Sequence, residues 1–109
     1  LNRLIAKDGS KGEIPKLVSK IRKSGAQVIY VGYLRSPGIA SLIDHCRNEG
    51  NELESRIDAF ANTDEGVHFL SLSDLVPNKD RSYHGPDMIH PSVKASKAIG
   101  AMIAEIIQP

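Results

Sequence analysis

The sequence predicts an α/β fold with a parallel sheet. Three observations predict it. Helical and strand patterns alternate in the order helix, strand, helix, strand, helix. The strand patterns lack the apolar–polar alternation of half-exposed strands, as is typical of parallel strands buried on both faces. Each helical pattern has a single apolar face. Only two strands are predicted, and two such strands leave unpaired edges and uncovered apolar side chains. We therefore expect residues 1–109 to be part of a single domain whose sheet is completed by other residues.

The first predicted helix covers residues 13–24. Pro15 stands in its first turn and Gly25 just past its end, the positions that these residues favour around helices. Its apolar residues recur at i, i+3, i+4 and i+7: Ile14, Leu17, Val18 and Ile21. Residues 27–33 form a β-branched run without alternation, which predicts the first strand.

The second half of the chain contains two further helical patterns and one further strand pattern. A loop over residues 34–42 precedes a predicted helix over 43–62. A short strand over 67–72 and a polar loop over 74–86 follow. Ser92 is placed to cap a final helix. We expect one face of the middle helix to be apolar: Leu53, Ile57, Phe60 and Ala61. The final helix should turn five apolar residues towards a core: Val93, Ile99, Met102, Ile103 and Ile106.

Composition excludes several classes of function. The chain has 14 basic and 13 acidic residues, so its net charge of +1 favours neither nucleic acid nor an anionic membrane as a partner. No apolar run approaches the roughly 20 residues of a transmembrane helix. The single cysteine, Cys46, cannot form an internal disulfide and is expected to be a half-buried helix residue rather than a nucleophile. Because the chain begins at Leu1 and not at a methionine, we expect a segment to precede it.

The most informative motif is Asp87-Met88-Ile89-His90-Pro91, just before the final helix. A serine hydrolase needs a histidine base, and it needs a carboxylate on the other imidazole nitrogen to fix the tautomer. Two intervening residues in a loop allow that contact. The blander alternative is that Asp87 fixes a turn and His90 caps the following helix.

The Asp87-x-x-His90-Pro91-Ser92 segment, followed by an amphipathic terminal helix, resembles the last conserved block of the SGNH (GDSL) hydrolases. Residues 13–33 also resemble the third helix and fourth strand of that family. The resemblance implies the carboxyl-terminal part of a flavodoxin-like, three-layer α/β/α sandwich. It implies an esterase or acylhydrolase in which His90 is the general base and Asp87 orients it. No cofactor or metal is implied.

The family's nucleophile block, Gly-Asp-Ser, is not found in this sequence. Asp8-Gly9-Ser10 and Leu72-Ser73-Asp74 contain similar letters, but neither follows an early strand. The resemblance therefore implies that an upstream segment or a companion chain carries the serine, and that the isolated chain is inactive. Asn2 is the nearest candidate for the oxyanion-hole asparagine, although no acid follows it. The substrate would be a small carboxylic ester, with Tyr83 and His84 beside the base as candidate substrate-binding residues.

Two other functions stay open. His84, Asp87 and His90 recur every three residues and have the chemistry of divalent-metal ligands. Gly85-Pro86 and Pro91 argue against the helix that would align them. The other alternative is a non-enzymatic, flavodoxin-like module that binds a partner or a small ligand between the loops after Tyr33 and Leu72, with Tyr30 and Tyr33 lining the crevice.

Overall fold

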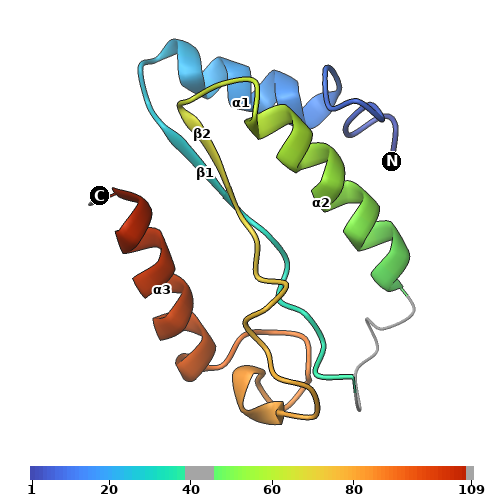
Figure 1. The fold of residues 1–109 in the computed structure, drawn as a ribbon, viewed down its shortest axis with the longest axis vertical. Coiled ribbons are helices and arrows are strands. Elements are labelled where there is room, and N and C mark those ends of the chain that lie inside the picture. The colour runs from blue at the N-terminus through green and yellow to red at the C-terminus, as the bar shows by residue number, and fades with distance from the viewer. Residues whose placement is uncertain (39–45, 108–109) are drawn as a thin grey trace. The chain divides into compact units, whose positions relative to one another are not determined.

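The computed structural model describes residues 1–38 and 46–107. Its helices and strands follow the predicted order (Figure 1), and their bounds are α1 Glu13–Lys23, β1 Val28–Val31, α2 Arg47–Ala61, β2 Val67–Leu70, the short 3-10 helix η2 Arg81–Tyr83 and α3 Val93–Ile107. Residues 39–45, which contain the end of the predicted loop and the start of the predicted middle helix, lie outside the described residues. The α/β fold is confirmed for the part of the chain that the structure describes.

The two strands pair in parallel. Val28 N–H donates to the Gly66 carbonyl at 2.9 Å, and Gly32 N–H donates to the Leu70 carbonyl at 2.8 Å. Both strands are shorter than predicted. The predicted burial on both faces is wrong for β1, because all four of its residues are only half-buried. Among the described residues the sheet has two strands, so each strand keeps an unpaired edge.

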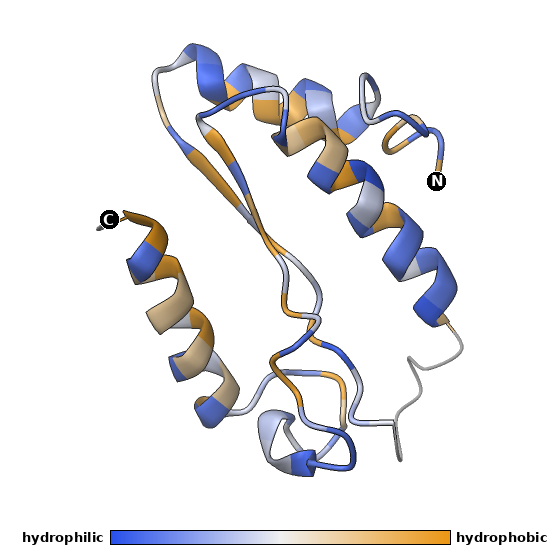
Figure 2. Ribbon diagram, in the orientation of Figure 1, coloured by the Kyte–Doolittle hydropathy of each residue, from blue (hydrophilic) through white to orange (hydrophobic). Residues whose placement is uncertain are grey.

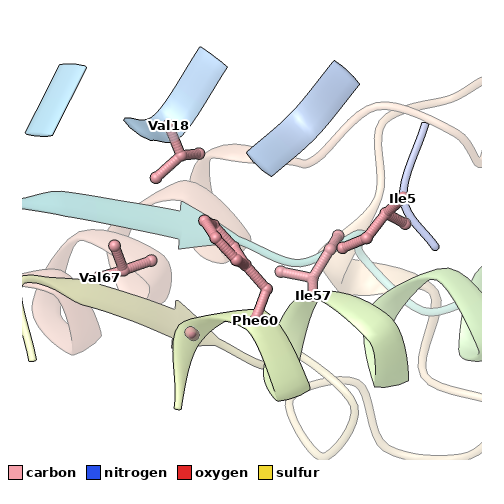
Figure 3. Packing of buried hydrophobic residues seen from close by; sticks show 6 residues of the cluster. Ile5, Val18, Ile57, Phe60 and Val67 are labelled. Carbon is pink, nitrogen blue, oxygen red and sulfur yellow. The ribbon is translucent and has the colours of Figure 1, made fainter. Parts of the chain in front are cut away.

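The chain divides into two units, of which the first comprises Leu1–Val31 and Asn48–Phe69. Its core joins α1, α2, β2 and the amino-terminal segment: Ile5, Val18, Ile57, Phe60, Ala61 and Val67. Figure 3 shows Phe60 and Ile57 of α2 among the side chains of this core. The apolar face predicted for the middle helix is confirmed, with Leu53 packed against the cluster and the other three residues within it.

Figure 2 shows that β1 and β2 are mainly hydrophobic and that the helices carry both hydrophobic and hydrophilic residues. The face predicted for the first helix is narrower than expected. Val18 is buried and Ile14 packs against the core, whereas Leu17 is 60% exposed and Ile21 is 39% exposed. Ile14 and Val18 lie one helical turn apart, as do Leu17 and Ile21. Only one of the two apolar rows of α1 therefore faces the core.

A buried arginine joins the amino-terminal segment to α2. Arg56 Nη1 donates to the Asn2 side-chain oxygen at 2.7 Å and to the Ile5 carbonyl at 3.0 Å, and its Nε donates to Glu52 at 3.4 Å. Gly9 has a φ of +76°, and a Cβ there would lie 2.6 Å from the Arg56 carbonyl oxygen. Close backbone packing therefore requires glycine at this position.

Ile57→Ala is expected to lower the free energy of unfolding by about 2–5 kcal/mol, because it leaves a cavity in the first unit. The Ile57 side chain is 1% exposed. Leu17→Ala is the matched control on an exposed helical face, with an expected change of about 0.5 kcal/mol or less. Urea unfolding followed by circular dichroism measures both. Equal losses for the two variants would contradict this packing.

The second unit comprises Gly32–Arg47 and Leu70–Pro109 and contains α3. The predicted cap is confirmed: Ser92 Oγ accepts from Ala95 N–H at 3.3 Å. The prediction that Val93 faces a core is wrong, since Val93 is 73% exposed. Four other predicted core residues are only half-buried: Ile99, Met102, Ile103 and Ile106. None of the helices in the described ranges combines the length and apolar character that crossing a membrane requires.

Candidate active site

A small hairpin-like loop holds the predicted catalytic pair. Gly85 N–H donates to the His90 carbonyl at 2.8 Å, and Ser92 N–H donates to the Tyr83 carbonyl at 3.0 Å. Inside it, Met88 N–H donates to the Gly85 carbonyl at 3.0 Å, which closes a tight turn. Backbone hydrogen bonds therefore hold the segment between η2 and α3 at its base and at its tip.

Asp87 contacts the backbone and the ring of His90 through different oxygens. Oδ1 accepts from Ile89 N–H at 2.9 Å and from His90 N–H at 3.0 Å. Oδ2 lies 2.5 Å from His90 Nδ1. Between them, Met88 has a φ of +59°, a conformation that non-glycine residues rarely adopt, and its side chain is buried. The turn at Met88 thus brings Asp87 and His90 together, as the motif predicts.

The pair is accessible from outside this chain. The His90 side chain is 80% exposed and that of Asp87 is 47% exposed. The hydrogen bond from the His90 side chain holds the pKa of the Asp87 carboxyl well below its usual range, and the Ile89 and His90 N–H groups add to this effect. At neutral pH Asp87 is a carboxylate. It therefore favours the imidazole tautomer with its proton on Nδ1, which leaves Nε2 as the basic nitrogen.

His90→Ala is expected to raise the pKa of Asp87 towards the ordinary aspartate value of about 3.9, since it removes the largest cause of the lowered pKa. The stability linked to this low pKa is present above the ordinary value and is lost as the pH falls towards the lowered one. Carboxyl carbon NMR measures the titration. Asp80 is the internal control: the Ser82 hydroxyl and N–H lower its pKa, and that pKa should not move. An unchanged Asp87 pKa would contradict the contact.

The two residues predicted to bind substrate lie at the base of this loop. Tyr83 is half-buried, and Lys94 Nζ lies 4.5 Å above the centre of its ring. His84 is 6% exposed, and neither of its ring nitrogens has a hydrogen-bond partner among the described residues. Burial lowers the pKa of His84, and the charge of Asp87 only partly opposes this. His84 is therefore a neutral ring below the surface, and substrate binding by either residue stays a prediction.

The metal-site alternative finds no support in the geometry, whereas the turn-fixing role of Asp87 is observed, since its Oδ1 accepts from the Ile89 and His90 N–H groups. In the described part of the chain, no three histidine, cysteine, aspartate or glutamate residues are grouped to hold a metal ion. His84 is buried, and Asp87 occupies Nδ1 of His90. The proposal that His90 caps the final helix is wrong, because Ser92 provides that cap.

Asn2 belongs to the first unit. Its side-chain oxygen accepts the hydrogen bond from Arg56. The oxyanion role would use the amide NH₂ group, which this bond does not involve, so the role stays a prediction.

A pocket of about 260 Å³ lies in the second unit, between the loops that follow β1 and β2. Its lining residues are Tyr33, Arg35, Ser36, Pro37, Gly38, Arg47, Ser73, Val76 and Asn78. These are the two loops predicted to form a crevice, and Tyr33 lines it as expected. Tyr30 does not line it: its ring centre lies 6.4 Å from that of Phe69 in the first unit. Arg35 and Arg47 were not predicted as site residues, although an arginine two residues after the predicted strand over 27–33 was an available signal.

Comparison with models of protein families, with curated proteins and with solved structures gives no match.

Proposed function

We propose that this chain supplies the aspartate and histidine of a serine esterase triad of the SGNH type. The observation that carries the proposal is the double engagement of Asp87. One carboxylate oxygen is fixed by two backbone N–H groups, and the other contacts His90 Nδ1 at 2.5 Å. A carboxylate held in this way orients an imidazole and stabilises its cation. The His90 side chain is 80% exposed, which leaves Nε2 accessible to a serine hydroxyl.

The proposed reaction is hydrolysis of a small carboxylic ester through an acyl-enzyme. The serine comes from an upstream segment or a companion chain. His90 Nε2 accepts the serine proton as the hydroxyl attacks the ester carbonyl, and then returns it to the leaving alcohol. Water, deprotonated by the same nitrogen, releases the acid. Asp87 stays ionised throughout and stabilises the imidazolium. The oxyanion donors come from the serine-bearing segment, with the Asn2 amide as a candidate within this chain.

The proposed whole domain is a three-layer α/β/α sandwich, completed by the segment that bears the serine. Two features support an additional layer and additional strands. The apolar side chains of β1 are only half-buried. On α3, Val93 is 73% exposed and Ile107 is 63% exposed. Apolar side chains of this kind gain stability when other elements cover them.

The rate of hydrolysis of a short-chain acyl ester tests the proposal. The chain of 109 residues alone should show no turnover above the uncatalysed rate, because it lacks the nucleophile block. The same chain combined with the serine-bearing segment should hydrolyse the ester. Turnover by the chain alone would overturn the mechanism.

A non-enzymatic binding module is the second candidate, and the pocket between the loops after β1 and β2 favours it. Ligands of open α/β sheets bind at the carboxyl ends of the strands, where this pocket lies. The two candidates are separated by whether any serine of the assembled protein becomes activated.

A further inference from the structure

We infer that the pocket between the loops after β1 and β2 binds a small oxyanion, namely the carboxylate or phosphate group of a ligand. The inference rests on the residues that line the pocket and is independent of the esterase reaction. Asp87 and His90 are not among those residues. An experiment that contradicts the esterase proposal therefore does not contradict the anion site, and the reverse also holds.

Two arginines give the pocket a positive charge. Arg35 comes from the loop after β1, and Arg47 is the first residue of α2, so two separate segments bring a guanidinium group to the same pocket. None of the described lining residues is acidic. The planar fork of guanidinium N–H donors matches the paired oxygens of carboxylate and phosphate groups. The described part of the lining therefore has the charge and the donor geometry that such an anion needs.

The pocket also holds neutral hydrogen-bond donors. Ser36, Ser73 and Asn78 also line the pocket. Ser36 Oγ accepts from Gly38 N–H at 3.0 Å, which leaves the hydroxyl proton of Ser36 to donate to a ligand. Hydroxyl and amide donors next to arginine add hydrogen bonds to an oxyanion without adding charge.

Contacts within the second unit hold the walls of the pocket in place. The guanidinium carbon of Arg35 lies 3.9 Å from the centre of the Tyr33 ring, which restricts the side chain before any ligand binds. Lys79 N–H donates to the Pro37 carbonyl at 2.7 Å and ties the two loops together. At Gly38, where φ is +87°, a Cβ would lie 3.1 Å from the Asn78 side-chain oxygen. Such preorganisation reduces the entropy lost on binding.

The pocket is small. Its volume of about 260 Å³ is below the roughly 300–1,000 Å³ of sites that enclose a drug-sized ligand. We therefore assign it to a small anion or to the charged end of a larger ligand.

Titration of the chain with sodium phosphate and, separately, with sodium acetate tests the inference. Backbone amide NMR should show saturable shifts at Gly38 and Asn78 with at least one of the two anions, with a Kd on the order of 1 mM. Saturation by phosphate alone would identify a phosphate site, and saturation by acetate alone a carboxylate site. Sodium chloride at the same ionic strength is the reference. Shifts that do not saturate, or that chloride reproduces, would overturn the inference.

Arg47→Gln is the decisive variant, because Arg47 is exposed and its replacement leaves the contact between Arg35 and Tyr33 in place. It should weaken binding of the saturating anion about tenfold or more, as expected for the loss of a charged hydrogen bond. Arg81→Gln is the matched control, since it removes the same charge from η2, outside the pocket. Equal affinities of the two variants would show that only net charge attracts the anion and would overturn the site.

Discussion

His90→Ala is expected to lower kcat for ester hydrolysis by about 10³-fold or more in the protein assembled with its serine-bearing segment. The variant removes the only group in the Asp87–His90 pair that can accept the serine proton. The His90 side chain is 80% exposed, so its loss should disturb the fold little. Steady-state kinetics measures the effect, and the thermal midpoint of unfolding shows whether the fold is retained.

Ile89→Ala is the control for disturbance of the loop. Ile89 lies beside His90, is 41% exposed and keeps its backbone N–H to Asp87 when it is replaced. We expect its kcat to stay within a few-fold of the unaltered protein, since surface substitutions of this kind change stability by only about 0.5 kcal/mol. Similar losses in the two variants would argue against a catalytic role for His90.

Asp87→Asn is expected to lower kcat by about 10⁴-fold, the size of loss seen when the triad aspartate of a serine protease is changed in the same way. The geometry gives the reason. Oδ1 of Asp87 accepts two backbone N–H groups, from Ile89 and His90. The single acceptor oxygen of an asparagine would take that position, and its NH₂ group would face His90 Nδ1. Nδ1 must then accept a hydrogen bond, so the proton moves to Nε2, which can no longer act as the base.

The control for this variant is Asp80→Asn. Asp80 is an acidic residue of the preceding loop, and its carboxylate caps η2 by accepting from Ser82 N–H. An asparagine can make the same cap. The expected pattern is therefore a large loss of kcat with little change in KM for Asp87→Asn, and a small effect for Asp80→Asn. Equal losses would mean that the loop, and not the tautomer of His90, determines the rate.

Periodicity and local spacing predicted the features that depend on neighbouring residues. The apolar positions of α2 and the cap at Ser92 are set within one element or turn, and both are confirmed. The contact between Asp87 and His90 spans three residues and follows from the motif. The sequence did not reveal that Met88 adopts a positive φ, because this conformation is imposed by the surrounding loop.

Features that depend on distant residues could not be predicted. Apolar spacing on α1 and α3 identifies apolar faces but not what covers them, so the exposure of Leu17 and Val93 was unexpected. Arginine is rarely buried, yet Arg56 is buried and donates hydrogen bonds to the Asn2 side chain and the Ile5 carbonyl of the amino-terminal segment. Arg35 and Arg47 both line the pocket, although they are 12 residues apart in the sequence. The residues between them are predicted to form a loop and the start of a helix, so the sequence did not indicate that the two arginines share a site.

The most direct test of the proposed triad is reaction of the assembled protein with a fluorophosphonate probe, followed by intact mass measurement of every polypeptide. A labelled serine in the upstream segment or companion chain, and no label when His90 is replaced with alanine, is the predicted result. The chain of 11.9 kDa described here should remain unlabelled on its own. Labelling that persists after His90→Ala, or the absence of any labelled serine in the assembled protein, would contradict the triad.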